Sequence, residues 1–260
     1  MPKPPKTPRV LIYDIETAPA IGLFFGKPYD VNIAKIIQHE YVFGFAYKWL
    51  GESKIHTCYI WDFPLYKKEK ANSIEVIKKW AALATEADVL VGHNSDSFDY
   101  KQMHGRLMLY KLPPIPKPQM FDSKKAAKQI GYYASNKLDD LGEMLGLGRK
   151  MKHDGIELWW ACMNDEEKAK KHMVSYNKRD VKITEALYLR QRPYTTNHPN
   201  LANIAERPEA CPVCLSEEGM LAQGWRKTKT GKFRRWQCKA CGSYVSNRRA
   251  EKGTVRPDYV

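Results

Sequence analysis

The sequence of 260 residues lacks the long apolar segments that mark membrane and secreted proteins. No apolar run approaches the roughly 20 residues that span a bilayer. Residues 1–9 also lack the apolar core of a signal peptide. We therefore expect an intracellular protein with no membrane partner.

Cysteine is scarce as well. Four of the six cysteines form two CxxC pairs near the C-terminus, whereas Cys58 and Cys162 stand alone in apolar surroundings. We expect these two to be buried thiols. The pattern excludes the disulfide framework of a small secreted protein.

Acidic residues are the third shortage, with 29 against 43 basic residues and a net charge of +14. This excess favours a polyanionic partner such as nucleic acid, although a solvated basic surface is the alternative. The apolar content of 43% and the aromatic content of 12% exclude a disordered chain. They are sufficient for one well-packed domain and a small appendage.

Short apolar runs predict strands, and apolar residues at helical spacing predict helices. Strands are expected at 10–14, 41–50, 54–62, 88–91 and 120–122. Helices are expected at 72–87, 98–110, 123–130, 138–145 and 165–189. The first helix is predicted to begin with a capping box of Asn72 and Glu75, and the chain from the first strand to about residue 40 to be loop-rich.

Helices that alternate with strands predict an α/β fold, and the hairpin of the second and third strands makes the sheet mixed. We expect four segments along the chain. They are a flexible basic tail at 1–8, a main domain at 9–192, a linker at 193–207 and a small C-terminal unit at 208–260.

Asp14 and Glu16 end the first apolar run. Residues i and i+2 of a strand point to the same side, so the two carboxylates enter one space and repel each other unless a cation lies between them. Hard carboxylate oxygens suit Mg²⁺ or Mn²⁺. A solvated or capping pair is the alternative.

Asp99 follows the predicted strand at 88–91 and opens a predicted helix. Ligands gather at the carboxyl ends of strands in open α/β sheets. A helix N-terminus also attracts an acid through its dipole, a role that Asp96 or Ser97 would fill equally well. Asp99 alone therefore decides nothing.

Tyr176 and Asp180 stand four residues apart, which places the phenol and the carboxylate on one face of the predicted helix. The alternative is that Asp180 pairs with Arg179 or Lys182 while Tyr176 packs in the core. This pair alone is equally indecisive.

Taken in order, Asp14-x-Glu16, Asp99 and Tyr176-x-x-x-Asp180 resemble the DEDD superfamily of 3′-5′ exonucleases, which have a ribonuclease-H-like fold. The resemblance covers roughly residues 8–192. It is to the tyrosine-bearing branch, since the other branch has histidine where this chain has Ser175. The segments around Asp14 and Asp99 also resemble the proofreading domains of family B DNA polymerases and free-standing phage or prokaryotic relatives.

The resemblance implies that Asp14, Glu16, Asp99 and Asp180 bind two Mg²⁺ or Mn²⁺ ions and that Tyr176 orients the attacking water. Asp14 would bridge the ions, with Glu16 and Asp180 on the nucleophile side and Asp99 contributing directly or through water. Without metal, neighbouring carboxylates should have raised and coupled pKa values. Asn94 is a further candidate for substrate contact, although loop asparagines more often serve turns.

Cys211-Pro-Val-Cys214 and Cys238-Lys-Ala-Cys241 are separated by 23 residues, an arrangement typical of a zinc ribbon. A redox pair is the alternative. Residues 208–260 lack the apolar residues for a large core, so one structural Zn²⁺ would supply much of the folding free energy.

Nine basic residues and no acid lie between Gly219 and Ala250, interleaved with aromatic residues. Cations with aromatics suit single-stranded nucleic acid, whose bases stack while its phosphates meet positive charge. Candidate contacts are Trp225, Arg226, Arg234 and Arg235. The alternative is that the aromatics, Trp236 above all, fill the core of the ribbon.

The sequence thus predicts a metal-dependent 3′-5′ exonuclease that prefers DNA and single-stranded 3′ ends. Its ribbon would hold the substrate or a partner such as a polymerase or another replication or recombination protein. The resemblance places it in the cytoplasm of a prokaryote or of a phage-infected cell. The alternatives are an inactive nucleic-acid-binding adaptor and a structure-specific endonuclease on the same fold.

Overall fold

A computed structural model describes residues 6–26, 32–229 and 231–247. Its centre is a five-stranded sheet in the order β5-β4-β1-β6-β7. The strands are β1 (Val10–Ala18), β4 (Tyr41–Trp49), β5 (His56–Tyr59), β6 (Val89–Gly92) and β7 (Gln119–Asp122). The pairs β1–β4 and β4–β5 are antiparallel, and β1–β6 and β6–β7 are parallel. The predicted mixed sheet is confirmed.

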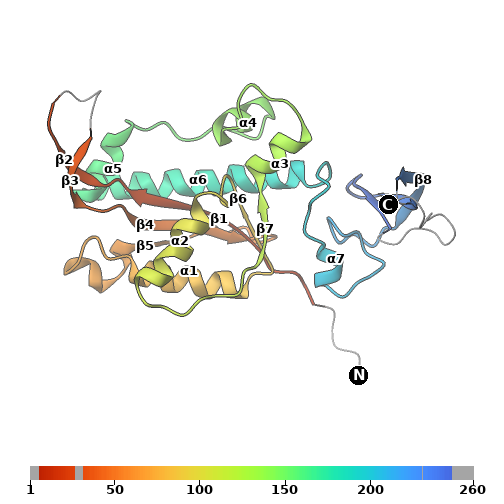
Figure 1. Cartoon of the computed structure of the whole chain (residues 1–260), viewed down its shortest axis with the longest axis horizontal. Coiled ribbons are helices and arrows are strands. Elements are labelled where there is room, and N and C mark those ends of the chain that lie inside the picture. Colours follow the sequence, from red (N-terminus) through yellow and green to blue (C-terminus); the bar gives the residue numbers. More distant parts are fainter. Residues whose placement is uncertain (1–5, 27–31, 230, 248–260) are drawn as a thin grey trace.

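Helices cover both faces of this sheet (Figure 1). On one side lie α1 (Ile74–Glu86) and α2 (Asp99–Leu109). On the other lie the long α6 (Glu167–Gln191), α3 (Ser123–Ile130), α4 (Leu138–Met144) and α5 (Ile156–Met163). Two short 3-10 helices, Ile60–Asp62 and Pro64–Lys67, follow β5. The predicted α/β fold with flanking helices is thus confirmed.

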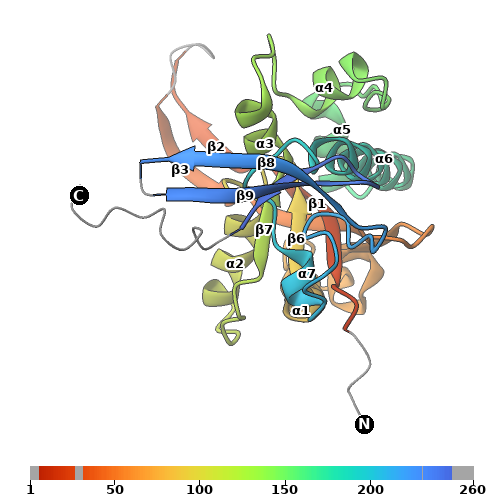
Figure 2. The ribbon, with the colours of Figure 1, turned by 90° about the vertical axis from the view of Figure 1, so that its right-hand side faces the viewer.

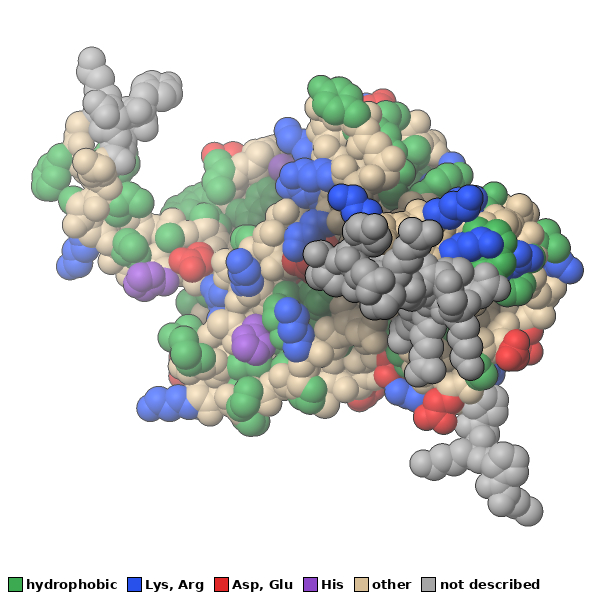
Figure 3. Space-filling view, turned by 45° about the vertical axis from the view of Figure 1, so that its right-hand side comes forward, with side chains coloured by type: hydrophobic (Ala, Val, Ile, Leu, Met, Phe, Trp, Pro, Cys, Tyr) green, Lys and Arg blue, Asp and Glu red, His purple; other side chains and the backbone are tan. Residues whose placement is uncertain are grey.

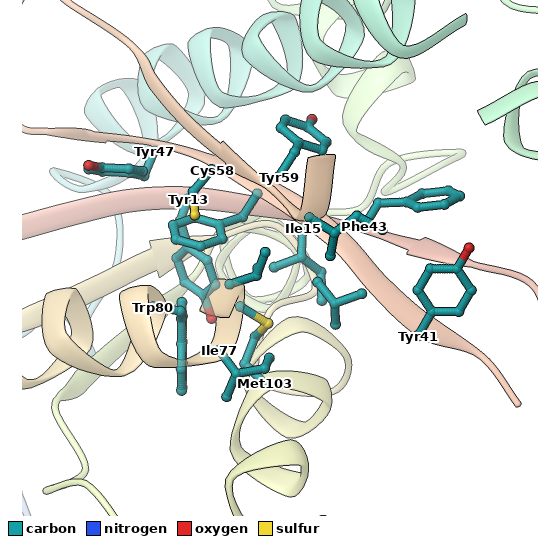
Figure 4. Close-up of a cluster of buried hydrophobic side chains, with 14 of the residues drawn as sticks. Tyr13, Ile15, Tyr41, Phe43, Tyr47, Cys58, Tyr59, Ile77, Trp80 and Met103 are labelled. Atoms are coloured by element: carbon teal, nitrogen blue, oxygen red, sulfur yellow. The ribbon is translucent and has the colours of Figure 1, made fainter. Parts of the chain in front are cut away.

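Side-chain alternation along β1 divides the core into two parts. Tyr13 and Ile15 pack toward α1 and α2 in a cluster that includes Trp80, as Figure 4 shows. Ile12 packs on the opposite face with Val181 of α6. Positions 14 and 16 continue the face of residue 12, so the fold turns both acids of β1 toward α6.

The segment after β1 differs from the loop-rich prediction. Strands β2 (Ile21–Phe24) and β3 (Ile33–Gln38) form a separate antiparallel hairpin. Leu23 and Ile33 on this hairpin are 54% and 61% exposed. Because the hairpin does not bury one face, its sequence lacks the alternation from which strands are predicted.

The predicted capping box at the start of α1 is wrong. The helix begins at Ile74 with Ser73 as its N-cap, so Glu75 is one position too early to close the box. The Asn72 side chain instead accepts a hydrogen bond from the N–H of Ile74 at 3.0 Å, and Glu75 pairs with Lys78.

The C-terminal unit is a small sheet in the order β10-β9-β8. Its strands are β8 (Met220–Thr228), β9 (Gly231–Cys238) and β10 (Tyr244–Ser246), all antiparallel. Figure 2 shows β8 and β9 lying side by side. We call residues 208–247 the ribbon.

A short helix, α7 (Leu201–Ile204), lies in the predicted linker, and its Leu201 is buried in the core against the sheet. The Leu201 N–H also donates to the carbonyl of Pro212 at 2.8 Å, which ties α7 to the ribbon. Across the described part of the chain, no helix is long and apolar enough to cross a bilayer.

Candidate functional site

Three of the predicted carboxylates meet between β1 and α6. Asp14 and Glu16 face the helix from β1, and Asp180 approaches them from α6. One carboxylate oxygen from each lies within 4.8 Å of the others. Glu16 and Asp180 are buried, so the fold holds like charges together away from bulk water.

Asp99 adjoins these three residues but has a different first partner. It is the first residue of α2, is buried, and accepts a hydrogen bond from the N–H of Ile15 on β1 at 3.1 Å. The N-cap of α2 is Phe98, which makes no side-chain capping bond. The carboxylate therefore fixes α2 to β1 and stands beside Asp14, whose pKa it raises.

Burial raises the pKa of every carboxyl in this group, and repulsion within the group raises the pKa values of Asp14 and Glu16 further, as expected. Burial is the largest cause for each, followed for Asp14 and Glu16 by repulsion from Asp180. The pKa of Glu16 rises from 4.5 to about 8, and that of Asp99 from 3.8 to about 7. The pKa values of Asp14 and Asp180 are raised as well.

The donor set fits a hard divalent cation. Among the described residues, one oxygen of Asp180, Oδ1, is buried without any hydrogen-bond partner. A buried carboxylate oxygen without a donor is costly, and a cation among these carboxylates would satisfy it. Oxygen-only ligands of this kind suit Mg²⁺ or Mn²⁺.

Lys150, which sequence reasoning missed, reaches into the same site. Its Nζ lies 2.5 Å from Oδ2 of Asp180 and donates to the Tyr176 hydroxyl at 3.0 Å. Burial lowers the Lys150 pKa, but the carboxylates of Asp180 and Asp14 outweigh it and raise the pKa. Lys150 follows α4 in an irregular segment, so no periodicity in the sequence points to it.

Asn177 is a second residue that the sequence did not reveal. Its Nδ2 donates to Oδ2 of Asp14 at 2.7 Å and to the Asp14 carbonyl at 3.2 Å. Its Oδ1 accepts from the Tyr59 hydroxyl at 3.0 Å. The amide thus fixes the Asp14 carboxylate, and its position beside Tyr176 is the only sequence signal for it.

Tyr176 is buried beside the carboxylates. Its ring makes edge contacts with His153 and Trp159, at centroid distances of 5.2 and 6.1 Å. Burial raises the pKa of its phenol to about 12. The hydroxyl is therefore neutral at physiological pH and can donate a hydrogen bond.

The loop between β6 and α2 is organised by Asp122. This residue caps α3 and also accepts the N–H groups of Asn94 and Asp96 at 3.0 and 3.2 Å. Asn94 has a positive φ of 65°, which asparagine tolerates better than most residues. Asp96 forms an ion pair with Lys125 at 2.7 Å, away from the carboxylate group.

The four cysteines of the CxxC pairs converge at one end of the ribbon, and their sulfurs lie within 4.8 Å of one another. Cys211 and Cys241 are 3.8 Å apart, and Cys214 and Cys238 are 3.7 Å apart. These distances are too long for a disulfide. They match the edge of a tetrahedron of about 3.8 Å that follows from a zinc–sulfur bond of about 2.3 Å.

The core of the ribbon consists of these cysteines with Val213 and Met220. The alternative that the aromatics fill this core is therefore wrong, since Trp225 and Trp236 are only partly buried and lie outside the cluster. Arg226 and Arg235 are exposed. Two of the nine basic residues, Arg248 and Arg249, lie outside the described residues.

A family model for the RNase H superfamily matches residues 33–191. The matched segment contains Asp99, Tyr176 and Asp180 but begins after Asp14 and Glu16. No curated protein matches the chain.

The structure is similar to that of the family B DNA polymerase from the hyperthermophilic archaeon Pyrobaculum calidifontis, with a TM-score of 0.52 and 17% identity. The match covers 77% of this chain and 27% of the polymerase chain. At this identity the likeness shows the fold alone.

Proposed function

The chain belongs to the RNase H superfamily, and we propose that it is a metal-dependent 3′-5′ exonuclease that hydrolyses the phosphodiester bonds of DNA. The observation that carries this proposal is the convergence of Asp14, Glu16 and Asp180, with Asp99 beside them. A structural role does not require buried like charges, which destabilise the fold in the absence of a cation.

Asp14, Glu16, Asp99 and Asp180 would hold two Mg²⁺ or Mn²⁺ ions, which when bound activate water and neutralise charge on the phosphate and the leaving oxygen. Asn177 orients the Asp14 carboxylate through its 2.7 Å hydrogen bond. Its amide thereby keeps the ligand oxygens in place before substrate arrives.

Tyr176 is the residue that we propose to orient the attacking water. Its neutral hydroxyl lies within 3.0 Å of the Lys150 ammonium group, which in turn pairs with Asp180. Lys150 therefore fixes the position of the Tyr176 phenol. In the metal-free protein it also compensates part of the negative charge of the carboxylates.

The ribbon is proposed to bind one structural Zn²⁺ and to hold the substrate or a replication or recombination partner. Both metal sites are served by the ligand types that the respective ions prefer, oxygen for Mg²⁺ or Mn²⁺ and thiolate for Zn²⁺. The excess of basic residues, some of which Figure 3 shows on the visible face, suits a nucleic-acid substrate.

The proposal is tested by incubating the full chain and its Asp14→Asn variant with DNA and RNA labelled at the 5′ end. Single-stranded, duplex and mismatched forms are compared in Mg²⁺, Mn²⁺ and without added divalent metal. We expect a ladder of products that shorten stepwise from the 3′ end, only with metal and only for the unchanged chain.

Internal cuts would instead identify an endonuclease, and tight binding without any cleavage would identify an adaptor. Either result would overturn the proposed exonuclease. Faster cleavage of RNA than of DNA would reassign the substrate and leave the reaction unchanged.

A further inference from the structure

We infer that one face of the ribbon sheet binds unpaired nucleotides by stacking their bases on tryptophan. We call this surface the indole face and define it by Trp225, Lys227, Lys232, Arg234 and Trp236. The inference rests on the proposed function, because a second site that retains the strand would let a nuclease make successive cuts without releasing its substrate.

The register of β8 and β9 places these residues on one side. Trp225 pairs directly with Arg234, and Lys227 pairs directly with Lys232. Paired residues of antiparallel strands share a face, and so do residues two apart along a strand. Trp236 therefore lies on the same side as Arg234.

Contacts within the indole face confirm this arrangement. The Lys232 Nζ lies 4.1 Å from the Trp225 ring centre. The Arg234 guanidinium lies 5.0 Å from the Trp225 ring and 5.8 Å from the Trp236 ring. Trp236 is held further by a 2.9 Å hydrogen bond from its Nε1 to Asn247. These contacts order the rings and cations before a ligand arrives, which lowers the entropic cost of binding.

The other face of the same strands has different chemistry. Arg226 pairs with Phe233 there, and Arg235 stacks on Tyr244 with 5.8 Å between guanidinium and ring centre. The Arg235 Nε donates to the Gln223 carbonyl at 3.3 Å, so this guanidinium already serves the fold. This second surface, the tyrosine face, lacks tryptophan and is the natural control.

Charge and stacking together select a single strand. The segment 219–247, which carries all three strands of the ribbon sheet, contains no aspartate or glutamate, so phosphates on this sheet meet no repulsion from its own side chains. Bases stack on aromatic rings only when their own faces are free, which favours an unpaired strand over a duplex. Of the four ribbon contacts predicted from the sequence, this inference retains Trp225 and Arg234 and leaves out Arg226 and Arg235.

The test measures binding separately from cleavage. The full chain carrying Asp14→Asn is titrated into a fluorescein-labelled single strand of about 20 nucleotides, long enough to contact an aromatic platform, without added Mg²⁺. Fluorescence anisotropy gives the dissociation constant at several salt concentrations. The same titration with the annealed duplex supplies the comparison.

Two matched pairs of variants compare the faces. Arg234→Ala and Arg235→Ala each remove one positive charge at adjacent positions, so their long-range attraction to phosphates falls equally. We expect Trp225→Ala to weaken single-strand binding by about 10-fold or more and Arg234→Ala by about 5-fold. Arg235→Ala and Tyr244→Ala should change it by less than about 2-fold.

Equal losses of single-strand affinity for variants of both faces would overturn the inference and indicate unspecific attraction by positive charge. Unchanged affinity for all these variants would show that the strand binds elsewhere, which also overturns it. Zinc content, together with the Trp225→Phe variant that keeps an aromatic ring, distinguishes lost stacking from lost folding. If the unmodified chain cleaves nothing while the indole-face variants still lose binding, the proposed function fails and this inference stands. If cleavage is normal but binding is unchanged, only this inference fails.

Discussion

The sheet domain and the ribbon each contain a cluster of potential metal ligands, but the apolar cores that surround the two clusters differ greatly in size. The sheet domain has a large apolar core in which Trp80, Tyr13 and Phe43 are fully buried. The core of the ribbon contains little beyond Cys211, Val213 and Cys238 and their immediate neighbours. The oxygen ligands of the first cluster are hard, and the sulfur ligands of the second are soft.

This difference indicates how each site relates to folding. Apolar burial in the sheet domain can support several carboxylates whose repulsion destabilises the fold. The described part of the ribbon has no comparable apolar burial, so we expect metal binding to supply much of its stability. In the sheet domain the apolar core therefore keeps the carboxylates in place, whereas in the ribbon we expect the metal site to stabilise the folded chain.

The largest expected effect is the loss of the ribbon when its metal site is broken. Cys238→Ser should abolish zinc binding, which contributes about 10 kcal/mol in small zinc domains, and should make residues 208–247 sensitive to protease. Metal analysis and limited proteolysis measure this outcome. Cleavage of a short DNA strand should persist, because the carboxylates stand on the other domain.

Cys162→Ala is the control for this experiment, since Cys162 is buried in the core of the sheet domain and not near the ribbon cysteines. It should retain zinc. If Cys238→Ser also unfolds the sheet domain, the two regions are one cooperative unit and the comparison fails.

The next effect concerns catalysis. Asp180→Asn should lower the cleavage rate by about 1,000-fold or more, because losing a ligand removes several kcal/mol of transition-state stabilisation. Initial rates with labelled DNA measure it. Asp96→Asn should cleave normally, because Asp96 pairs with Lys125 outside the carboxylate group. Loss of cleavage in Asp96→Asn together with normal cleavage in Asp99→Asn would show that Asp96, and not Asp99, belongs to the catalytic site.

A smaller effect is a pH-dependent stability that distinguishes Glu16 from surface acids. Its pKa is raised on folding from 4.5 to about 8, so its protonated form favours the folded state and stability is lost as pH rises through that range. Without divalent metal, Glu16→Gln should be more stable than the unchanged chain at pH 8.5, by on the order of 3 kcal/mol, and about equal at pH 4.

Urea unfolding at several pH values measures this difference. Mn²⁺ should reverse its sign at high pH, because only the unchanged chain gains full metal binding. Glu157→Gln, at an exposed position of α5, should show no such pH dependence. A stability difference between Glu16→Gln and the unchanged chain that stays the same at every pH would contradict the view that the sheet domain supports destabilising charge.

The smallest effect tests Lys150 as the internal cation. Lys150→Met should destabilise the metal-free protein by about 1–2 kcal/mol, less than a fully buried ion pair, because the Lys150 side chain is 31% exposed. Saturating Mn²⁺ should reduce the difference. Lys152→Met, two residues away and exposed, is the control, and an equal loss there would remove Lys150 from the site.

Much of the sheet domain could be predicted from local patterns. The apolar run before Asp14 predicted β1, and the acids at its end pointed to a cation, because the two-residue period of a strand fixes which side chains share a side. The spacing of the four cysteines likewise predicted one cluster. In each case the decisive information lies within a few residues or in a spacing of known geometry.

Lys150 and Asn177 could not be predicted, because their partners are distant in sequence. Lys150 reaches Asp180 over 30 residues, and Asn177 reaches Asp14 over 163 residues. The β2–β3 hairpin was missed for the related reason that it buries no face. Local periodicity indicates which side chains of an element face the core. It does not indicate which side chain from a distant part of the sequence will contact them.

The sequence by itself determined the types of ligand, their order and the class of fold. The tertiary structure decided which acids meet, which lysine opposes them, and which of two adjacent arginines shares a face with the tryptophans. The reason is physical. Residue chemistry and short-range period are properties of the chain, whereas a site is a set of distances that exists only after strands pair in register and helices pack across them.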